Sequence, residues 1–385
     1  MPAQTRRRAA RNEVSAVKHI DASLSPRSFF SRRFDVCVST HLSGPPASYP
    51  QAVSPVFPIL LLSAAVGVSP SLTAQNARPD PKSKDAPVPA MIWRDPGDVS
   101  TLDLLNGAGG REHGPDPNGR YTFIQEDQDG TSPKFSVRDA AGTEWKVKLG
   151  PEVQCETAAT RLLWAVGYFV EEDYYLSQLT VDKLPTLRRG RNLVGPDGIV
   201  KTARLKRRSG DITKRENWHW FDNPFLKSRE FNGLRVMMSF LNNWDLKDVN
   251  NTVYHTSTER RYLVSDVGAT FGNTGNYFTR SKNETKEYAR SGFVSAAHAG
   301  SVDFVLHDRP FFLTAIDVVR YRRHARMEQI AKDIPSEDAR WLGRQLSKLS
   351  DEQIKDCFRA AGYRPEEVDA YADVVRKRIA ALNAL

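Results

Sequence analysis

Two short stretches of this 385-residue chain carry side chains that could do chemistry. The first, Asn243–Asn251, reads NWDLKDVNN, and the second, Ser265–Gly268, reads SDVG. Asp245 could take a proton from a hydroxyl group, while Asn250 and Asp266 offer the oxygen atoms that Mg²⁺ prefers. Phosphoryl transfer needs both functions, an acid near the attacking hydroxyl and oxygen ligands that hold a metal on the phosphates. The spacing therefore favours a phosphotransferase.

A helix and a hairpin are predicted to position the two stretches. Pro224 is expected to open the helix, whose apolar residues recur at helical spacing at Leu234, Met237, Met238 and Leu241. That helix leads the chain directly into Asp245. Residues 252–255 and 262–265 are predicted to form a hairpin whose second strand ends at Asp266.

Upstream, three predicted strands precede a predicted helix. The strands cover residues 121–124, 135–139 and 144–149, and the helix runs from about 152 to 166. Within the third strand, Trp145, Val147 and Leu149 share one face, and Lys146 and Lys148 share the other. The helix has an apolar stripe at Ala159, Leu162, Leu163 and Val166.

A lysine and a glutamate in these elements are expected to pair. Glu156 lies beside the apolar stripe, where an unpaired charge would be costly. Lys148 is one connection away and is the expected partner. Lys146 remains an alternative for the lysine, and Glu152 for the glutamate.

Backbone amides in the first hairpin are candidates for phosphate binding. The segment from Gly130 through Ser132 to Lys134 is the candidate in that hairpin, although it holds one glycine. Residues 106–110 hold more glycine but lie one strand too early. A plain β-turn is the alternative interpretation of both segments.

Taken together, these motifs resemble the atypical, protein-kinase-like superfamily, which includes HipA-type toxin kinases, phosphatidylinositol kinases, spore-coat CotH kinases and secretory-pathway kinases. D-L-K-x-x-N from Asp245 to Asn250 has the spacing of a kinase catalytic loop, and Asp266-Val267-Gly268 is similar to D-F-G. The chain looks closest to uncharacterised exported bacterial proteins of this kind. The resemblance covers roughly residues 120–275.

The resemblance implies an α+β, bilobal protein-kinase-like fold, with a small antiparallel-sheet lobe carrying one key helix and a larger, mostly helical lobe. The roles it implies are ATP binding by Gly130, Ser132, Lys148 and Glu156, catalysis by Asp245 and Lys247, and metal binding by Asn250 and Asp266. Asn243-Trp244 stands where ordinary protein kinases have His-Arg, Val267 replaces Phe, and no A-P-E follows. The spacing from Lys148 to Glu156 is also shorter. These departures concern the acceptor more than the nucleotide.

The expected activity is an ATP- and metal-dependent phosphotransferase using Mg²⁺ or Mn²⁺, with a protein, carbohydrate or small-molecule acceptor. Adenylyl transfer belongs beside it, because related folds also transfer AMP. An alternative is a catalytically silent nucleotide-binding or scaffold protein of the same fold. A third is a secreted α+β domain that only mimics the motifs. Retention of the lysine, the glutamate, both aspartates and the asparagine favours activity, since a scaffold has no chemical need for all five.

The N-terminal region carries a signal-like segment. Residues 57–68 form an apolar run that is shorter than the about 20 residues of a membrane helix. It matches a signal-peptide core followed by a cleavage site at Leu72-Thr73-Ala74. We expect export to the periplasm or outside, a cytoplasmic protein if the segment is not a signal, and no stable membrane span.

The expected domain organisation is a disordered or mis-annotated leader at 1–55, a signal-like segment at 56–75, a linker at 76–100, the small nucleotide-binding lobe at 101–182 and the large catalytic lobe at 183–385. Residues 168–200 are expected to cross between the lobes. Amphipathic helices are predicted near 311–332, 337–348, 351–361 and 365–383.

The charge distribution bears on nucleic-acid binding, and the cysteine content bears on disulfide bridges. The net charge is +9, and residues 1–75 hold eight Lys/Arg against three Asp/Glu. The basic run 204–208 is interpreted as part of a solvated loop over 201–217, so no nucleic-acid partner is expected. Cys155 and Cys357 are expected to fill apolar space, with a single bridge between them left open.

Overall fold

The computed structural model describes residues 88–275, 279–306 and 318–385. The chain divides into two units, Met1–Ala77 and Arg78–Leu385, and the described residues belong to the second. The leader and signal-like segment expected at 1–55 and 56–75 lie outside the described residues. Among the described residues, no helix has the length and apolar character that crossing a membrane requires.

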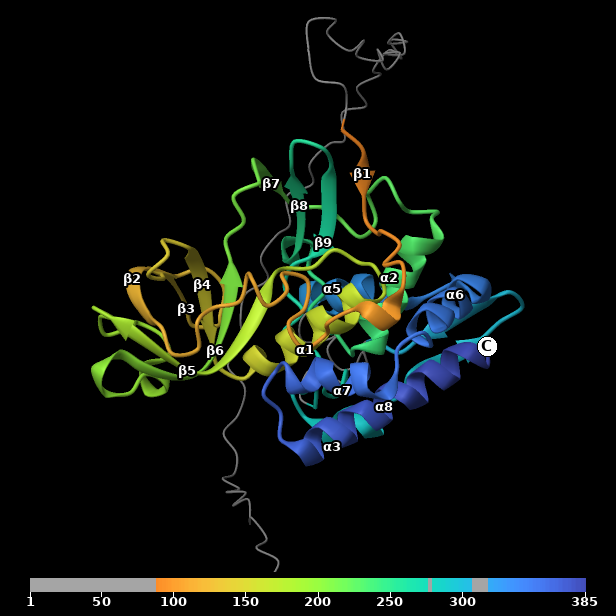
Figure 1. The fold of residues 1–385 in the computed structure, drawn as a ribbon. Helices are drawn as coiled ribbons and strands as arrows, with labels where there is room; N and C mark the ends of the chain where they lie inside the picture. Colours follow the sequence, from red (N-terminus) through yellow and green to blue (C-terminus); the bar gives the residue numbers. More distant parts are fainter. Residues whose placement is uncertain (1–87, 276–278, 307–317) are drawn as a thin grey trace, which may run out of the picture. The chain divides into compact units, whose positions relative to one another are not determined.

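The small lobe is a closed barrel (Figure 1). Its strands are β2 (Arg120–Asp127), β3 (Lys134–Arg138), β4 (Glu144–Leu149), β5 (Asp173–Asp182) and β6 (Ile199–Arg207). The order is β2-β3-β4-β6-β5, and a parallel pairing of β2 with β5 closes it. All the other pairs are antiparallel. Trp145, Val147 and Leu149 point into the core as predicted, which leaves Lys146 and Lys148 on the outer face of β4.

Helix α1 (Glu152–Ala165) packs against β4, β5 and β6 on one side and against α7 (Asp351–Arg359) on the other. Nearly all of its side chains are buried for this reason. The predicted stripe Ala159, Leu162 and Leu163 belongs to the core of the large lobe. The helix therefore links the two lobes, and the residues on its N-terminal turns face the barrel.

The large lobe combines two small sheets with helices. One sheet has the order β1-β9-β8-β7 and the other β10-β11-β12. Their strands are β1 (Ala90–Met91), β7 (Lys214–Glu216), β8 (Asn251–His255), β9 (Arg260–Val264), β10 (Val294–Ala297), β11 (Ser301–Phe304) and β12 (Ile334–Pro335). The remaining helices are α2 (Arg229–Phe240), α3 (Thr285–Arg290), α5 (Val318–Glu328), α6 (Ser336–Leu346) and α8 (Pro365–Asn383).

The predicted α+β, two-lobed organisation and the predicted order of its elements are confirmed. Helix α2 leads to the loop that holds Asp245, and the β8–β9 hairpin leads to Asp266, as expected. Cys155 and Cys357 are buried free thiols. Within the described part of the C-terminal region, α5, α6, α7 and α8 correspond to the four predicted helices.

Three predictions about the connections are wrong. Residues 199–207 form barrel strand β6 instead of a solvated loop, because their charges pair with buried carboxylates. The small-lobe sheet therefore continues past the expected boundary at residue 182, and the chain leaves the barrel after Arg207. Helix α2 begins at Arg229, where the Ser228 hydroxyl accepts a hydrogen bond from the Phe231 amide, and not at Pro224.

The segment expected to be a linker up to residue 100 also has structure where it is described. Ala90 and Met91 pair in parallel with β9, and Ile92 is buried in the core of the large lobe. Burial of an apolar side chain stabilises this attachment by roughly 1.5–3 kcal/mol.

Candidate active site

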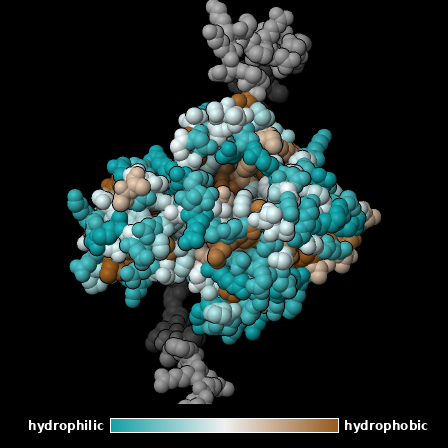
Figure 2. Space-filling view, viewed as in Figure 1, coloured by the Kyte–Doolittle hydropathy of each residue, from teal (hydrophilic) through white to brown (hydrophobic). Residues whose placement is uncertain are grey.

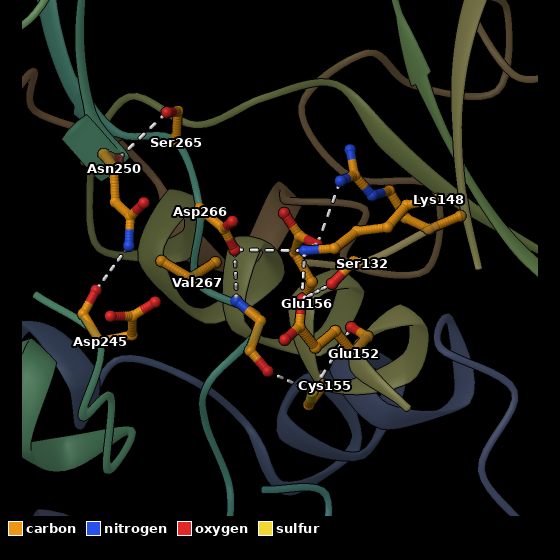
Figure 3. A network of polar contacts seen from close by, with 12 residues as sticks. Ser132, Lys148, Glu152, Cys155, Glu156, Asp245, Asn250, Ser265, Asp266 and Val267 are labelled. Atoms are coloured by element: carbon orange, nitrogen blue, oxygen red, sulfur yellow. Dashed lines mark hydrogen bonds and ion pairs between the residues drawn. The ribbon is translucent and has the colours of Figure 1, made fainter. Parts of the chain in front are cut away.

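Lys148 lies at the centre of a buried ion cluster (Figure 3). Its Nζ is 2.6 Å from Glu152 Oε2, 2.8 Å from Glu156 Oε2 and 3.2 Å from Asp266 Oδ1. Lys148 is only 2% exposed. Burial opposes its charge, but the carboxylates of Glu156 and Asp266 raise the pKa of the ammonium group above its ordinary value. Both of the glutamates left open by the sequence therefore contact this lysine.

Lys146 forms its ion pair outside the cluster. Its side chain is 42% exposed, and its ammonium pairs with Asp127. The structure thus brings Lys148, and not its alternative Lys146, to Glu156.

Behind Lys148, Arg204 bridges two buried carboxylates. Its Nη2 is 3.1 Å from Glu156 Oε2, and its Nη1 is 2.9 Å from Asp173 Oδ1. Arg204, Glu156 and Asp173 are all buried. Burial raises the pKa of Glu156, against the opposing effect of Arg204 and Lys148. The sequence interpretation missed Arg204 because it placed the residue in a loop.

Glu152 connects two further residues, Ser132 and Lys282, to the cluster. The Ser132 hydroxyl donates to Glu152 Oε2 at 2.9 Å, and Lys282 pairs with Oε1. Burial works to raise the pKa of Glu152, but Lys148 and Lys282 hold it at about 2. Of the two predicted phosphate-loop residues, Ser132 lies at the cluster. Gly130 lies in the exposed β2–β3 turn, with a φ of +66° that favours glycine.

Asp266 presents its carboxylate to the cluster from the end of β9. The side chain is 43% exposed, and the Gly268 amide donates to its Oδ1 at 3.3 Å. Burial works to raise the pKa of Asp266, but the ammonium of Lys148 outweighs it and holds the pKa below its ordinary value. The close approach of Glu152 explains why a glycine stands at position 268, because a Cβ there would come within 2.9 Å of the Glu152 Cβ.

Asn250 connects the two motifs found in the sequence. Its Nδ2 donates to the Asp245 carbonyl at 2.7 Å, and its own carbonyl accepts from the Ser265 amide at 2.8 Å. The Asp245 carboxylate is part-exposed, with Lys247 Nζ 2.7 Å from its Oδ1. Figure 3 shows Asp266 between the Asp245–Asn250 pair and the Lys148 cluster. The structure therefore connects Asp266 to Lys148 on one side and to Asn250 on the other, and Asn250 and Lys247 both contact Asp245.

Two buried asparagines, Asn242 and Asn243, hold the loop that carries Asp245 in place through hydrogen bonds. The Asn243 side chain accepts a hydrogen bond from the Asp245 amide at 3.2 Å. Asn242 has a φ of +54°, in the left-handed region that asparagine tolerates. Its side chain donates to the Gly272 carbonyl at 2.6 Å and accepts from Arg378 Nη1 at 2.7 Å. Arg378 comes from α8, and no local pattern in the sequence indicates this role.

Two basic side chains from the segment after Asp266 contact Trp244, in the loop that carries Asp245. The Arg280 guanidinium lies 4.2 Å from the centroid of the Trp244 ring, and the Lys282 ammonium 5.8 Å from it. Trp244 Nε1 donates to the Ser281 carbonyl at 2.9 Å. The sequence interpretation missed both cations, which lie over the ring of Trp244 because the chain folds back after Asp266.

A cavity of about 540 Å³ borders the outer face of the barrel. Its walls include Ser136, Lys146, Lys206 and Arg215, together with acidic residues such as Asp127. Lys146 precedes Lys148 by two residues on the same face of β4, but the walls of the cavity include no residue of the Lys148 cluster. Its polar, mixed-charge walls suit a ligand with several hydrogen-bonding groups.

A second hollow, of about 420 Å³, lies near β8 and β9 and has aromatic walls that include Trp164, Tyr168 and Phe169. Figure 2 shows recessed apolar surface among hydrophilic residues near the centre of this face. Its walls do not include the residues of the Lys148 cluster.

Comparison with known proteins gives matches in structure alone. No family model and no curated protein matches the chain. The Helicobacter pylori proinflammatory kinase CtkA has 11% identity, a TM-score of 0.40 and coverage of 68% of this chain and 96% of that one. The Golgi casein kinase with Mn/ADP bound has 8% identity, a TM-score of 0.38 and coverage of 71% and 74%. A further structure of the Golgi casein kinase has 9% identity, a TM-score of 0.30 and coverage of 69% and 76%. At this level of similarity, the chemistry has to follow from the residues themselves.

Proposed function

We propose that the protein is an ATP- and metal-dependent phosphotransferase of the atypical kinase type. The observation that carries the proposal is the contact of Lys148 with both Glu156 on α1 and Asp266 after β9. Asn250 extends this connected set to Asp245. A positive group for phosphates, oxygen ligands for a metal and an acid for the acceptor thus come together from distant parts of the chain.

ATP would be held by the barrel side of the site. Lys148 and Ser132 would contact its phosphates, and Glu156 keeps Lys148 in place through the 2.8 Å ion pair. The 540 Å³ cavity at the outer face of the barrel is of the size that ligand pockets have, about 300–1,000 Å³. Its polar groups on Ser136 and Lys206 could contact the nucleoside.

The residues present fit Mg²⁺ or Mn²⁺ held jointly with phosphate. No group of three or more His, Cys, Asp or Glu among the described residues could hold a metal ion alone. Asp266 and Asn250 offer one carboxylate and one amide oxygen. Mg²⁺ commonly binds one or two carboxylates plus substrate phosphates. The metal would therefore bind with the nucleotide, and it would neutralise charge on the phosphates.

Asp245 is proposed as the catalytic acid/base. Its part-exposed carboxylate can accept a hydrogen bond from an acceptor hydroxyl and then its proton. Lys247, now paired with this carboxylate, would help to neutralise charge on the transferring phosphoryl group.

Transfer of label from ATP tests the proposal. The full chain, with Mg²⁺ or Mn²⁺ and a mixture of protein acceptors, is expected to transfer label from [γ-³²P]ATP. It is expected to transfer none from [α-³²P]ATP, and a chelator should abolish transfer. Label from the α position alone would show adenylyl transfer instead. Absence of transfer in both cases, with ATP bound, would favour the silent nucleotide-binding protein.

Export is also part of the proposal. It rests on the apolar run and cleavage site at 57–74, outside the described residues. Mass spectrometry of the mature N-terminus from the producing cell tests it, with a terminus at Gln75 as the expected result.

A further inference from the structure

Helix α5 presents an exposed basic stripe. Val319, Arg322, Arg323 and Arg326 follow helical spacing and are all exposed, whereas His324 and Met327 on the opposite side are buried. Neither Arg322 nor Arg323 forms an ion pair with another residue in the part of the chain that the structure describes. Three guanidinium groups thus face solvent together.

The stripe ends beside the catalytic loop. Arg326 Nη2 is 3.8 Å from Asp248 Oδ2, and its guanidinium lies 5.2 Å from the centroid of the Phe221 ring. Asp248 also accepts from the Trp220 amide at 3.2 Å and contacts His219. Since Asp248 follows Asp245 by three residues, the two Cα atoms are at most about 11 Å apart.

An apolar hollow opens next to this contact. It has a volume of about 150 Å³ and is lined by Trp220, Phe221, Leu226, Phe231, Arg235 and Ile330. Phe221 and Leu226 are exposed large apolar residues. Such a volume holds a group the size of a benzene ring.

Trp220, which lines the hollow, has a buried polar atom without a partner among the described residues. Trp220 is 2% exposed, and its Nε1 finds no acceptor among the described residues. The hollow itself offers an apolar space that is bordered by the aromatic residues Trp220, Phe221 and Phe231.

We propose that this surface binds the acceptor, a protein segment with acidic residues and one apolar anchor residue. This inference rests on the proposed phosphotransferase function. The anchor side chain occupies the hollow, the carboxylates pair with Arg322, Arg323 and Arg326, and an extended chain reaches Asp245 within a few residues. Of the acids near this surface, Asp248 already has three partners and Glu328 is part-buried and pairs with Lys332, which leaves Asp222 exposed, so the surface keeps a positive excess.

Peptide binding to the full chain without ATP tests the inference separately from catalysis. The probes are a fluorescein-labelled peptide of Glu, Asp, Leu and Ser, a second peptide with Lys for each acid, and a third with Ser for each Leu. Fluorescence anisotropy is expected to show the acidic, Leu-containing peptide binding about tenfold more tightly than either control.

Variants of the surface residues test whether the peptide binds at α5 and the hollow. Arg322→Glu with Arg323→Glu should weaken binding of the acidic peptide about tenfold, and Leu226→Glu should weaken it similarly. The matched control is Arg340→Glu with Arg344→Glu on α6, where both arginines contact Glu337, and it should leave binding unchanged.

Equal binding of the three peptides, or equal loss in the α6 control, would overturn the inference. Binding to phosphatidylserine vesicles without any preference among the peptides would also overturn it. Peptide preference that persists in a protein without ATP-dependent transfer would contradict the proposed function and keep this surface as a peptide-binding site.

Discussion

Replacing Asp245 with Asn is expected to lower phosphoryl transfer by about 10²–10⁴-fold, the range for loss of a general base. ATP affinity should change little, because the Asp245 carboxylate contacts Lys247 and not the Lys148 cluster. The loop should keep its conformation, since Asn250 binds the Asp245 carbonyl and Asn243 binds its amide. Single-turnover transfer and ATP titration measure the two quantities.

Asp369→Asn is the matched control for this substitution. Asp369 forms an exposed ion pair with Lys355 on the helical lobe, and the same loss of charge there should leave the rate unchanged. A wild-type transfer rate in Asp245→Asn would remove Asp245 from the catalytic role. A large loss of ATP affinity would show that it acts on the nucleotide instead.

Replacing Arg204 with Met is expected to cause the largest loss of stability. The substitution leaves Asp173 without its cationic partner and Glu156 with Lys148 alone, and all these groups are buried. Removing one partner of a buried ion pair typically costs about 3–5 kcal/mol. For a unit of this size, we expect the melting temperature to fall by roughly 5–10 °C.

Arg208→Met provides the comparison, because Arg208 follows β6 directly but forms an exposed pair with Glu144. Exposed pairs contribute about 0–1 kcal/mol, so calorimetry should show a fall of at most about 2 °C. If the two variants lost the same stability, the buried Arg204 bridge would not be holding Glu156 and the barrel together.

The local patterns of the sequence were sufficient to locate most of the site. The alternation of apolar and polar residues along β4 predicted that Lys148 lies on the face away from the core. Helical spacing predicted that Glu156 lies beside the buried stripe. The spacing of Asp245, Asn250 and Asp266 matched the observed loop and hairpin. These relations depend on residues close in sequence, which periodicity can reveal.

Residues that act across long distances could not be found in this way. Arg204 pairs with carboxylates on α1 and β5, Lys282 with Glu152, and Arg378 with Asn242. Their partners lie on other elements, so a charged residue at these positions looks the same as a solvated one. The sequence of β6 did contain the alternation typical of a strand, since Ala203 and Leu205 flank Arg204. The many basic residues in the segment led to its interpretation as a loop.

Thermal unfolding of the full chain with ATP and Mg²⁺ or Mn²⁺, beside Asp266→Asn, tests the central claim most directly. At about 100 times Kd, bound ligand stabilises the folded state by about 2.7 kcal/mol. We predict a rise of roughly 5 °C in the melting temperature of the wild type, dependent on the metal and lost in the variant. No rise in folded protein, or an equal, metal-independent rise in Asp266→Asn, would contradict a nucleotide and metal site at Lys148 and Asp266.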